Sequence, residues 1–254
     1  MTLRSSPLLL ALLLASLLGC SRGRDDRRVV RVAASAALRD TLGELAAVFE
    51  RTHPGVRVEP SFVSSGAAVQ QIEQGAPFDL FYSADERYAR EVERTGRAVA
   101  GTLAVYARGT LVLWIAERVG LEPTSLEVLR DERVRRVALA QPEVSPYGRA
   151  ARQALERAGL WDAVRSKLVF AQDMSQAAQQ ALTAADAGLL PLSLALSPAL
   201  AEAGRQLVVP GELHEPLDQS GVVLRDGPDA RAFHEFVLGE PGRRILAAHG
   251  FGLP

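Results

Sequence analysis

Two serines and a glycine stand where a helix is expected to begin, in the segment SFVSSGAAVQQIEQGAPFDLFYSAD of residues 61–85. The pattern predicts the end of a strand, a turn at Ser64, Ser65 and Gly66, and then a helix over residues 67–74. A helix N-terminus carries backbone N–H groups without helical partners and the positive end of the helix dipole, so it attracts an anion. Either serine would equally serve as an ordinary N-cap, and this segment alone leaves both interpretations open.

The same local plan of strand, small polar loop and helix occurs four times along the chain, at residues 33–38, 61–67, 140–149 and 170–176. From Val29 onward, short apolar runs alternate with amphipathic stretches, which is typical of βαβ units around a largely parallel sheet. Ligands of open α/β sheets bind beyond the carboxyl ends of the strands, where such loops gather. We therefore expect four helix N-termini to converge on one ligand.

Hydrophobic periodicity and the positions of glycine and proline predict the elements. A first helix occupies residues 38–49. A last helix occupies residues 230–249 and is interrupted near 239–242, where Pro241 restarts it. The expected strands are residues 29–34, 78–83, 111–115, 137–140, 168–171, 188–192 and 222–224.

Length and composition narrow the class of protein. The 254 residues are enough for two lobes with separate cores. The formal net charge is −1 and the basic and acidic residues are interspersed, so we expect no nucleic-acid partner. Alanine and leucine abound while aromatic residues make up 6%, as in soluble α/β proteins.

The first 20 residues predict a signal peptide. Arg4 provides a positive n-region, residues 8–18 form an apolar run too short to span a bilayer, and the tetrapeptide LLGC ends at Cys20. That tetrapeptide resembles a bacterial lipobox, whose cysteine becomes lipid-modified, so we expect a lipoprotein anchored on the periplasmic side with a tether over residues 21–28. A plain secretory signal with an incidental cysteine is the alternative. Cys20 is the only cysteine, so no intramolecular disulfide can form.

Five segments together resemble the periplasmic molybdate-binding proteins of ABC importers. They match in order and spacing and cover the chain from about residue 29 to 254; they are SFVSSGAAVQQIEQGAPFDLFYSAD, QPEVSPYGRAA, FAQDMSQA, ADAGLLPLS and HGFGLP. The resemblance implies the type II periplasmic binding protein fold, with two α/β lobes, a mixed and mostly parallel sheet in each, and two crossing segments. The implied lobes are residues 29–108 with 219–254, and residues 109–218, with hinges near 108–111 and 219–222.

The resemblance also implies ligand-binding residues. The serine of the family's second loop corresponds to Ser65, which would donate its hydroxyl and its backbone N–H. The third and fourth positions, both backbone donors, correspond to Tyr147 and Met174. The serine of the first loop falls on Ala37 when no gap is allowed, and Ser35 is the alternative if the loop shifts.

The match to the family is incomplete at one further position. A tyrosine hydroxyl used by some members would lie at Pro191 or Leu192, and neither residue has a hydroxyl. Ser64, beside the matched serine, is another possible contact. Tyr147 could supply a phenol from a different direction, although packing at a turn explains that side chain equally well.

The expected ligand suits such a site chemically. Molybdate at neutral pH is a tetrahedral dianion without a proton, so it needs hydrogen-bond donors on every side and no acceptor. Helix N-termini and serine hydroxyls supply these donors without arginine or lysine. Phosphate keeps a proton and would leave that donor unmatched, whereas sulfate differs only in size. Tungstate is nearly as large as molybdate and should bind too.

Carboxylates and histidines give no competing site. Asp79 and Asp85 flank the strand expected at 78–83, and in a binding protein we expect them to cap helices or to hold loops. The four histidines lack metal-ligand spacing, so no metal site is expected beyond the oxyanion itself. They are His53, His214, His234 and His249.

Two other classes of protein are alternatives to a molybdate receptor: a receptor for a different solute and a serine hydrolase. A receptor for sulfate, for a metal ion or for an organic solute would share this fold. Ferric iron is usually bound by clustered phenolates and carboxylates, and the four tyrosines are not clustered in the sequence. A serine hydrolase using Ser64 or Ser65 would need a nearby base, and the G-x-S-x-G motif is absent from that segment. We expect no enzyme and no cofactor, but a monomeric solute-binding protein that delivers molybdate to an ABC permease.

Overall fold

The structure is a computed structural model and describes residues 26–254. The predicted signal peptide, the lipidation site Cys20 and tether residues 21–25 lie outside the described residues. Within residues 26–254, no helix is both long and apolar enough to cross a bilayer.

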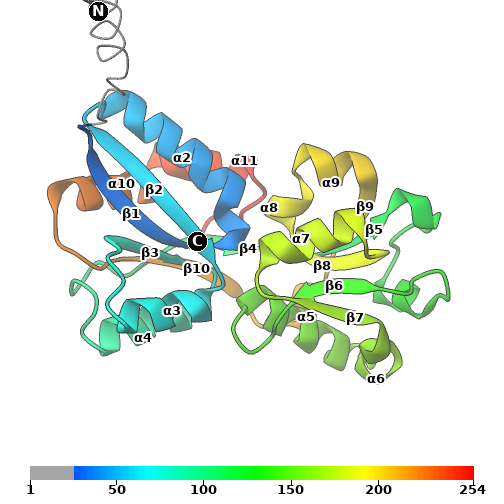
Figure 1. The fold of residues 1–254 in the computed structure, drawn as a ribbon. Coiled ribbons are helices and arrows are strands. Elements are labelled where there is room, and N and C mark those ends of the chain that lie inside the picture. Colours follow the sequence, from blue (N-terminus) through cyan, green and yellow to red (C-terminus); the bar gives the residue numbers. More distant parts are fainter. Residues whose placement is uncertain (1–25) are drawn as a thin grey trace, which may run out of the picture.

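Two five-stranded sheets form the centres of two lobes that lie side by side (Figure 1). The first sheet has the strand order β2-β1-β3-β10-β4. In it β10 alone runs against its neighbours β3 and β4, while β1 is parallel to β2 and β3. Its strands are β1 (Arg28–Ser35), β2 (Val56–Val63), β3 (Leu80–Ser83), β4 (Ala104–Gly109) and β10 (Leu217–Val223).

The second sheet repeats this plan with the order β7-β6-β8-β5-β9. Here β5 is the strand that runs against its neighbours β8 and β9, while β6 is parallel to β7 and β8. The predicted mixed and mostly parallel sheet in each of two lobes is therefore confirmed. The strands are β5 (Leu111–Ala116), β6 (Val137–Ala140), β7 (Leu168–Ala171), β8 (Ala187–Pro191) and β9 (Gly204–Val208).

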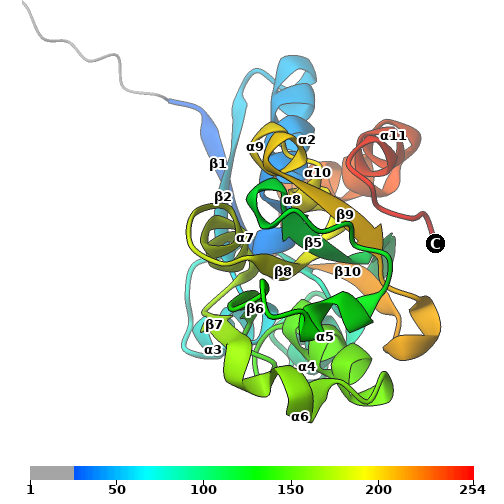
Figure 2. The ribbon, with the colours of Figure 1, turned by 90° about the vertical axis from the view of Figure 1, so that its right-hand side faces the viewer.

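Helices cover both sheets, as the two views at right angles show (Figures 1 and 2). Those of the first lobe are α2 (Arg39–Thr52), α3 (Ser65–Glu73), α4 (Glu86–Arg94), α10 (Pro228–Leu238) and α11 (Glu240–Ala248), with the 3-10 turn η1 (Ala36–Leu38) before α2. Those of the second lobe are α5 (Pro146–Arg157), α6 (Trp161–Val164), α7 (Met174–Thr183), α8 (Leu192–Ala195) and α9 (Pro198–Ala203). Short 3-10 turns complete this lobe and its return passage: η2 (Glu117–Val119), η3 (Leu126–Arg130), η4 (Arg165–Lys167) and η5 (Gly211–Leu213).

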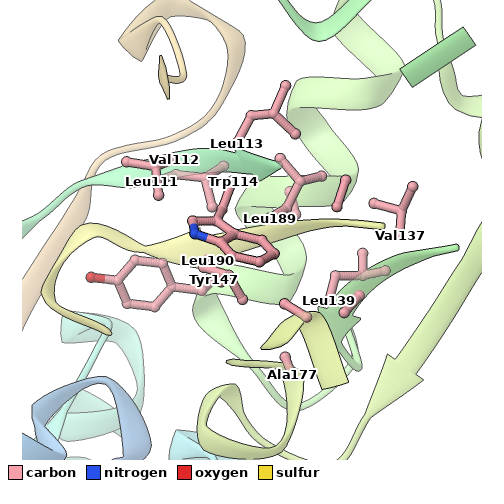
Figure 3. Close-up of a cluster of buried hydrophobic side chains, with 14 of the residues drawn as sticks. Leu111, Val112, Leu113, Trp114, Val137, Leu139, Tyr147, Ala177, Leu189 and Leu190 are labelled. Atoms are coloured by element: carbon pink, nitrogen blue, oxygen red, sulfur yellow. The ribbon is translucent and has the colours of Figure 1, made fainter. Parts of the chain in front are cut away.

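The core of the second lobe is built on β5, whose six residues are all buried (Figure 3). Trp114 is its largest side chain, and the indole N–H donates to the carbonyl of Leu200 at 2.9 Å. In the first lobe, the sheet buries one face against α2 and α10, where Phe49 packs edge-on against Phe233 with ring centres 5.1 Å apart. Each lobe thus has its own apolar core, so the loops between strands and helices rest on rigid supports.

The chain passes between the lobes twice. The first passage is the step from β4 to β5 at 109–111, which overlaps the predicted hinge at 108–111. The return passage covers residues 209–216, between β9 and β10, whereas the predicted hinge at 219–222 lies inside β10 and pairs with both of its neighbours. The prediction missed the start of β10 because Asp218, Gln219 and Ser220 interrupt its apolar run.

Candidate functional site

The first loop brings its two candidate residues to one point. Ser35 ends β1 and caps η1, where its Oγ accepts the N–H of Ala37 at 3.4 Å. The exposed fractions are 4% for Ser35 and 1% for Ala37. The Ser35 hydroxyl and the Ala37 N–H, which are the donors of the two alternative registers, therefore lie next to each other in this loop.

The second loop differs from the prediction in one respect. Ser65 and Gly66 are not in a turn but form the first residues of α3, and Ser64 is the N-cap. Among residues 26–254, no backbone N–H at this helix end bonds the Ser64 hydroxyl as a cap. The Ser65 hydroxyl, which is fully buried, instead accepts the N–H of Ala84 at 3.1 Å. An ordinary side-chain cap thus explains neither serine, and Ser65 keeps its own hydrogen for donation.

The third and fourth loops lead into α5 and α7, and each of these helices has a side-chain N-cap. Ser145 caps α5, and its Oγ accepts the N–H of Gly148 at 3.3 Å. Asp173 caps α7 and accepts the N–H of Gln176 at 2.9 Å. N–H groups in the first turn of a helix have no helical acceptor, so those of Tyr147 and Met174 are suited to meet a ligand.

Contacts between the lobes join these four helix N-termini. Arg39, which follows the first loop, donates its Nε to the hydroxyl of Ser175 in α7 at 2.8 Å. Gly66 in α3 donates its backbone N–H to the carbonyl of Val144, just before α5, at 3.0 Å. The first loop therefore meets the fourth, and the second meets the third, across the boundary between the lobes.

The fifth predicted position has no donor for a ligand. Pro191 lacks an N–H, and the N–H of Leu192 donates to the carbonyl of Thr110 at 2.9 Å. The next residue, Ser193, is only 5% exposed, and its hydroxyl donates to the carbonyl of Ala37 at 2.8 Å. Sequence reasoning missed Ser193, although it closes the segment ADAGLLPLS on which the resemblance partly rests.

The phenol of Tyr147 lies between the lobes. In Figure 3 its oxygen points out of the cluster, away from Val137 and Leu139. It reaches Gly109 at the first passage, where an added Cβ would overlap the phenol and would lie 2.6 Å from Nε2 of Gln219. Burial raises the pKa of Tyr147, so the phenol stays protonated. The side chain is buried and packs against the first passage between the lobes, which favours the packing alternative.

The two carboxylates have the structural roles that the sequence predicted. Asp79 accepts the N–H of Arg31 at 2.7 Å, and Asp85 caps α4 by accepting the N–H of Arg87 at 2.7 Å. Asp85 also forms an ion pair with Arg149 of α5, which sequence reasoning missed. This ion pair joins the two lobes beside the candidate loops. The positive charge of Arg149, in the first turn of α5, is therefore already balanced by a carboxylate.

Neither the phenols nor the histidines favour the competing functions. Burial raises the pKa values of Tyr82, Tyr106 and Tyr147, which disfavours the phenolates that a ferric ion would need. The Ser65 hydroxyl bonds a backbone N–H, and each of the four histidines forms hydrogen bonds with other groups within residues 26–254, so no histidine is paired with Ser65 there. No group of three or more His, Cys, Asp and Glu gathers within residues 26–254.

Known proteins are similar to this chain over most of its length. The family of bacterial extracellular solute-binding proteins matches residues 30–252. A molybdate-binding protein of Azotobacter vinelandii is 35% identical, over 94% of both chains, and one of Rhodobacter capsulatus is 32% identical, over 98% of this chain and 96% of the relative. The solved Azotobacter vinelandii periplasmic molybdate-binding protein superposes with a TM-score of 0.80 at 31% identity, covering 89% of this chain and 99% of its own.

Proposed function

The chain belongs to the family of bacterial extracellular solute-binding proteins, and on this premise we propose that it captures molybdate outside the cytoplasm and delivers it to the permease of an ABC transporter. Tungstate, which has the same charge and shape, is a second ligand. The protein acts by binding alone, as a monomer, and Cys20 carries the lipid that anchors it to the periplasmic side of a membrane.

One arrangement supports the proposal: loops that offer uncharged donors meet in pairs across the boundary between the lobes. The first lobe contributes Ser65 and the Ser35–Ala37 turn, and the second contributes the helix starts at Tyr147 and Met174. The relatives from Azotobacter vinelandii and Rhodobacter capsulatus, which are similar over most of this chain, carry molybdate in their names. The loops at Ser65, Tyr147 and Met174 lie in segments that carried the resemblance in the sequence.

The donors match the chemistry of an unprotonated dianion. Each hydrogen bond to a charged group contributes about 1.5–3 kcal/mol, so several of them offset the cost of removing molybdate from water. Arg149 pairs with Asp85 and Arg39 donates to Ser175, so both cations beside the loops have protein partners. The anion is then held by dipoles that need little rearrangement when it leaves.

Capture and release follow from closure of the lobes. The ligand contacts both lobes only when they are closed, so it favours that state by its difference in affinity. The contact of Gly66 with Val144 represents the closed arrangement. We propose that the passages at 109–111 and 209–216 bend when the lobes open, while the two cores stay rigid.

Calorimetric titration of the purified protein tests the function. We expect molybdate and tungstate to bind with one site per chain, and Ser65→Ala to weaken both by about 10- to 100-fold, which corresponds to one lost charged hydrogen bond. Ser61→Ala removes an exposed hydroxyl from the preceding strand and should change nothing. Wild-type protein that ignores molybdate, or Ser65→Ala protein with unchanged affinity, would contradict the assignment.

Sulfate in the same titrations separates the two oxyanion functions. A site sized for molybdate should bind sulfate more weakly, because shorter S–O bonds leave some donors out of reach. Since bound ligand raises the melting temperature by mass action, a thermal-shift series gives an independent measurement. Stronger stabilisation by sulfate than by molybdate would favour a sulfate receptor.

A further inference from the structure

The Ser65 hydroxyl ends a buried chain of hydrogen bonds that runs through one peptide unit. The N–H of Ala84 donates to Ser65 Oγ at 3.1 Å. The carbonyl of Ser83 belongs to the same peptide unit and accepts the phenolic O–H of Tyr106 at 3.3 Å. Ser65 and Ser83 are fully buried and Tyr106 is 1% exposed. The chain is thus shielded from water, where each bond polarises the next.

Tyr106 is a stable donor at the far end of this chain. It lies on β4, and its ring packs edge-on against Tyr82 with ring centres 5.3 Å apart, which holds the phenol in place. Burial raises the pKa of Tyr106 well above its ordinary value, so the phenol keeps its hydrogen at neutral and mildly alkaline pH.

The orientation of the peptide decides what Ser65 can offer to a ligand. A hydroxyl has one hydrogen and two lone pairs, and the N–H of Ala84 occupies one lone pair. The hydroxyl hydrogen therefore points away from Ala84. If the peptide turned over, the carbonyl of Ser83 would face Ser65, take that hydrogen and leave a lone pair for the ligand. The bond from Tyr106 to this carbonyl opposes such a turn.

We propose, on the basis of the function above, that Tyr106 is a positioning residue that keeps Ser65 a hydrogen donor and so sets the preference for oxyanions without a proton. Molybdate and sulfate offer only acceptors and fit a donor. Hydrogen arsenate carries one O–H, which needs an acceptor; with its hydrogen turned toward the ligand, Ser65 offers at most one lone pair for that O–H. Tyr106 touches no ligand in this arrangement and acts through the peptide of Ser83 and Ala84.

Tyr106→Phe tests the proposal because it removes one oxygen and keeps the ring. Molybdate and sulfate would be titrated calorimetrically at mildly alkaline pH, and arsenate affinity would be read from displacement of molybdate so that weak binding registers. We expect the affinities for molybdate and for sulfate to fall by the same factor, about fivefold. The ratio of the molybdate affinity to the arsenate affinity should fall about tenfold, which is the scale of one hydrogen bond.

Tyr82→Phe is the matched control. Tyr82 is equally buried and touches Tyr106, but its hydroxyl meets Nδ1 of His234 at 3.2 Å. This variant should keep the preference of the wild type, and melting curves show that each variant is folded during titration. Equal losses for all three anions in Tyr106→Phe, or a preference for molybdate over arsenate that does not change, would overturn the role of Tyr106 alone. A wild-type protein that binds none of them would overturn the proposed function as well.

Discussion

Ser193 on α8 donates its hydroxyl to the backbone carbonyl of Ala37, 2.8 Å away, and this bond joins the two lobes at the first loop. Both residues are buried, so the bond is made where water does not compete for the carbonyl. It stands one residue beyond the place where some family members would present a tyrosine hydroxyl. In this chain, the hydroxyl of that region therefore bonds the backbone of the first candidate loop.

Loss of this bond should weaken closure. Ser193→Ala leaves the Ala37 carbonyl buried without its donor, which costs the closed state about 1 kcal/mol, or about fivefold in molybdate affinity. Ser197→Ala changes a nearby serine whose hydroxyl caps no helix N–H among the described residues, and should be neutral. Equal calorimetric affinities for wild type and Ser193→Ala would show that the bond does not support the closed state.

The ion pair between Asp85 and Arg149 should slow ligand release. The side chains are 9% and 24% exposed, and Asp85 keeps Arg87 as a second partner, so we expect Arg149→Met to cost the closed state about 1 kcal/mol. Stopped-flow measurement should then show molybdate leaving about fivefold faster. Arg152→Met removes a pair within α5, with Glu156, and serves as the control. An unchanged release rate would contradict this role.

Gly109 should be required for closure. An added Cβ would overlap the phenol of Tyr147, and overpacking of this kind costs about 1–3 kcal/mol. Gly109→Ala is expected to lose about tenfold or more in molybdate affinity, and X-ray scattering should show less compaction when ligand is added. Gly211→Ala, where no described residue lies within 4 Å of the new Cβ, should close normally. Full compaction of the Gly109→Ala protein would disprove this prediction.

His234 should make stability depend on pH. Burial lowers its pKa in the folded protein, and Nε2 lies 2.9 Å from the carbonyl of Thr102. Since the unfolded chain binds the proton more readily, the stabilisation is complete above about pH 6.5 and is lost as pH falls toward the folded pKa. Urea denaturation between mildly acidic and neutral pH should show this loss.

The control variants separate His234 from the other histidines. His234→Gln should flatten the pH dependence, whereas His53→Gln, at an exposed position, should retain it. The absolute stability of His234→Gln is expected to be lower, because its contacts with Tyr82 and Thr102 are altered. A wild-type slope that survives in His234→Gln would assign the titration to another group.

Most of the fold could be predicted from local pattern. The strands at 137–140 and 168–171 were predicted with the bounds observed, and the break in the last helix falls where glycine and Pro241 placed it. The pattern missed β4 and β9, which lie at sheet edges and carry Arg108 and Arg205. Edge strands stay partly exposed and can carry charged residues. Their sequences therefore lack the continuous apolar run by which the other strands were predicted.

The candidate site, too, could be predicted only in part from the sequence. The sequence by itself determined where donors are available, because the start of a helix depends on residues within a single turn of it. It therefore located the loops at Ser35, Ser65, Tyr147 and Met174, while their binding of an anion stays a prediction.

Only the tertiary structure decided which partner each side chain meets. Ser65 bonds Ala84 at a separation of 19 residues, Asp85 meets Arg149 at 64, and Ser193 reaches Ala37 at 156. The Ser65 bond forms when α3 packs beside β3, and the other two pairs form when the lobes come together; nothing in the spacing of the residues encodes either placement. For that reason the donors could be found in the sequence, whereas the contacts that orient them and join the lobes could not.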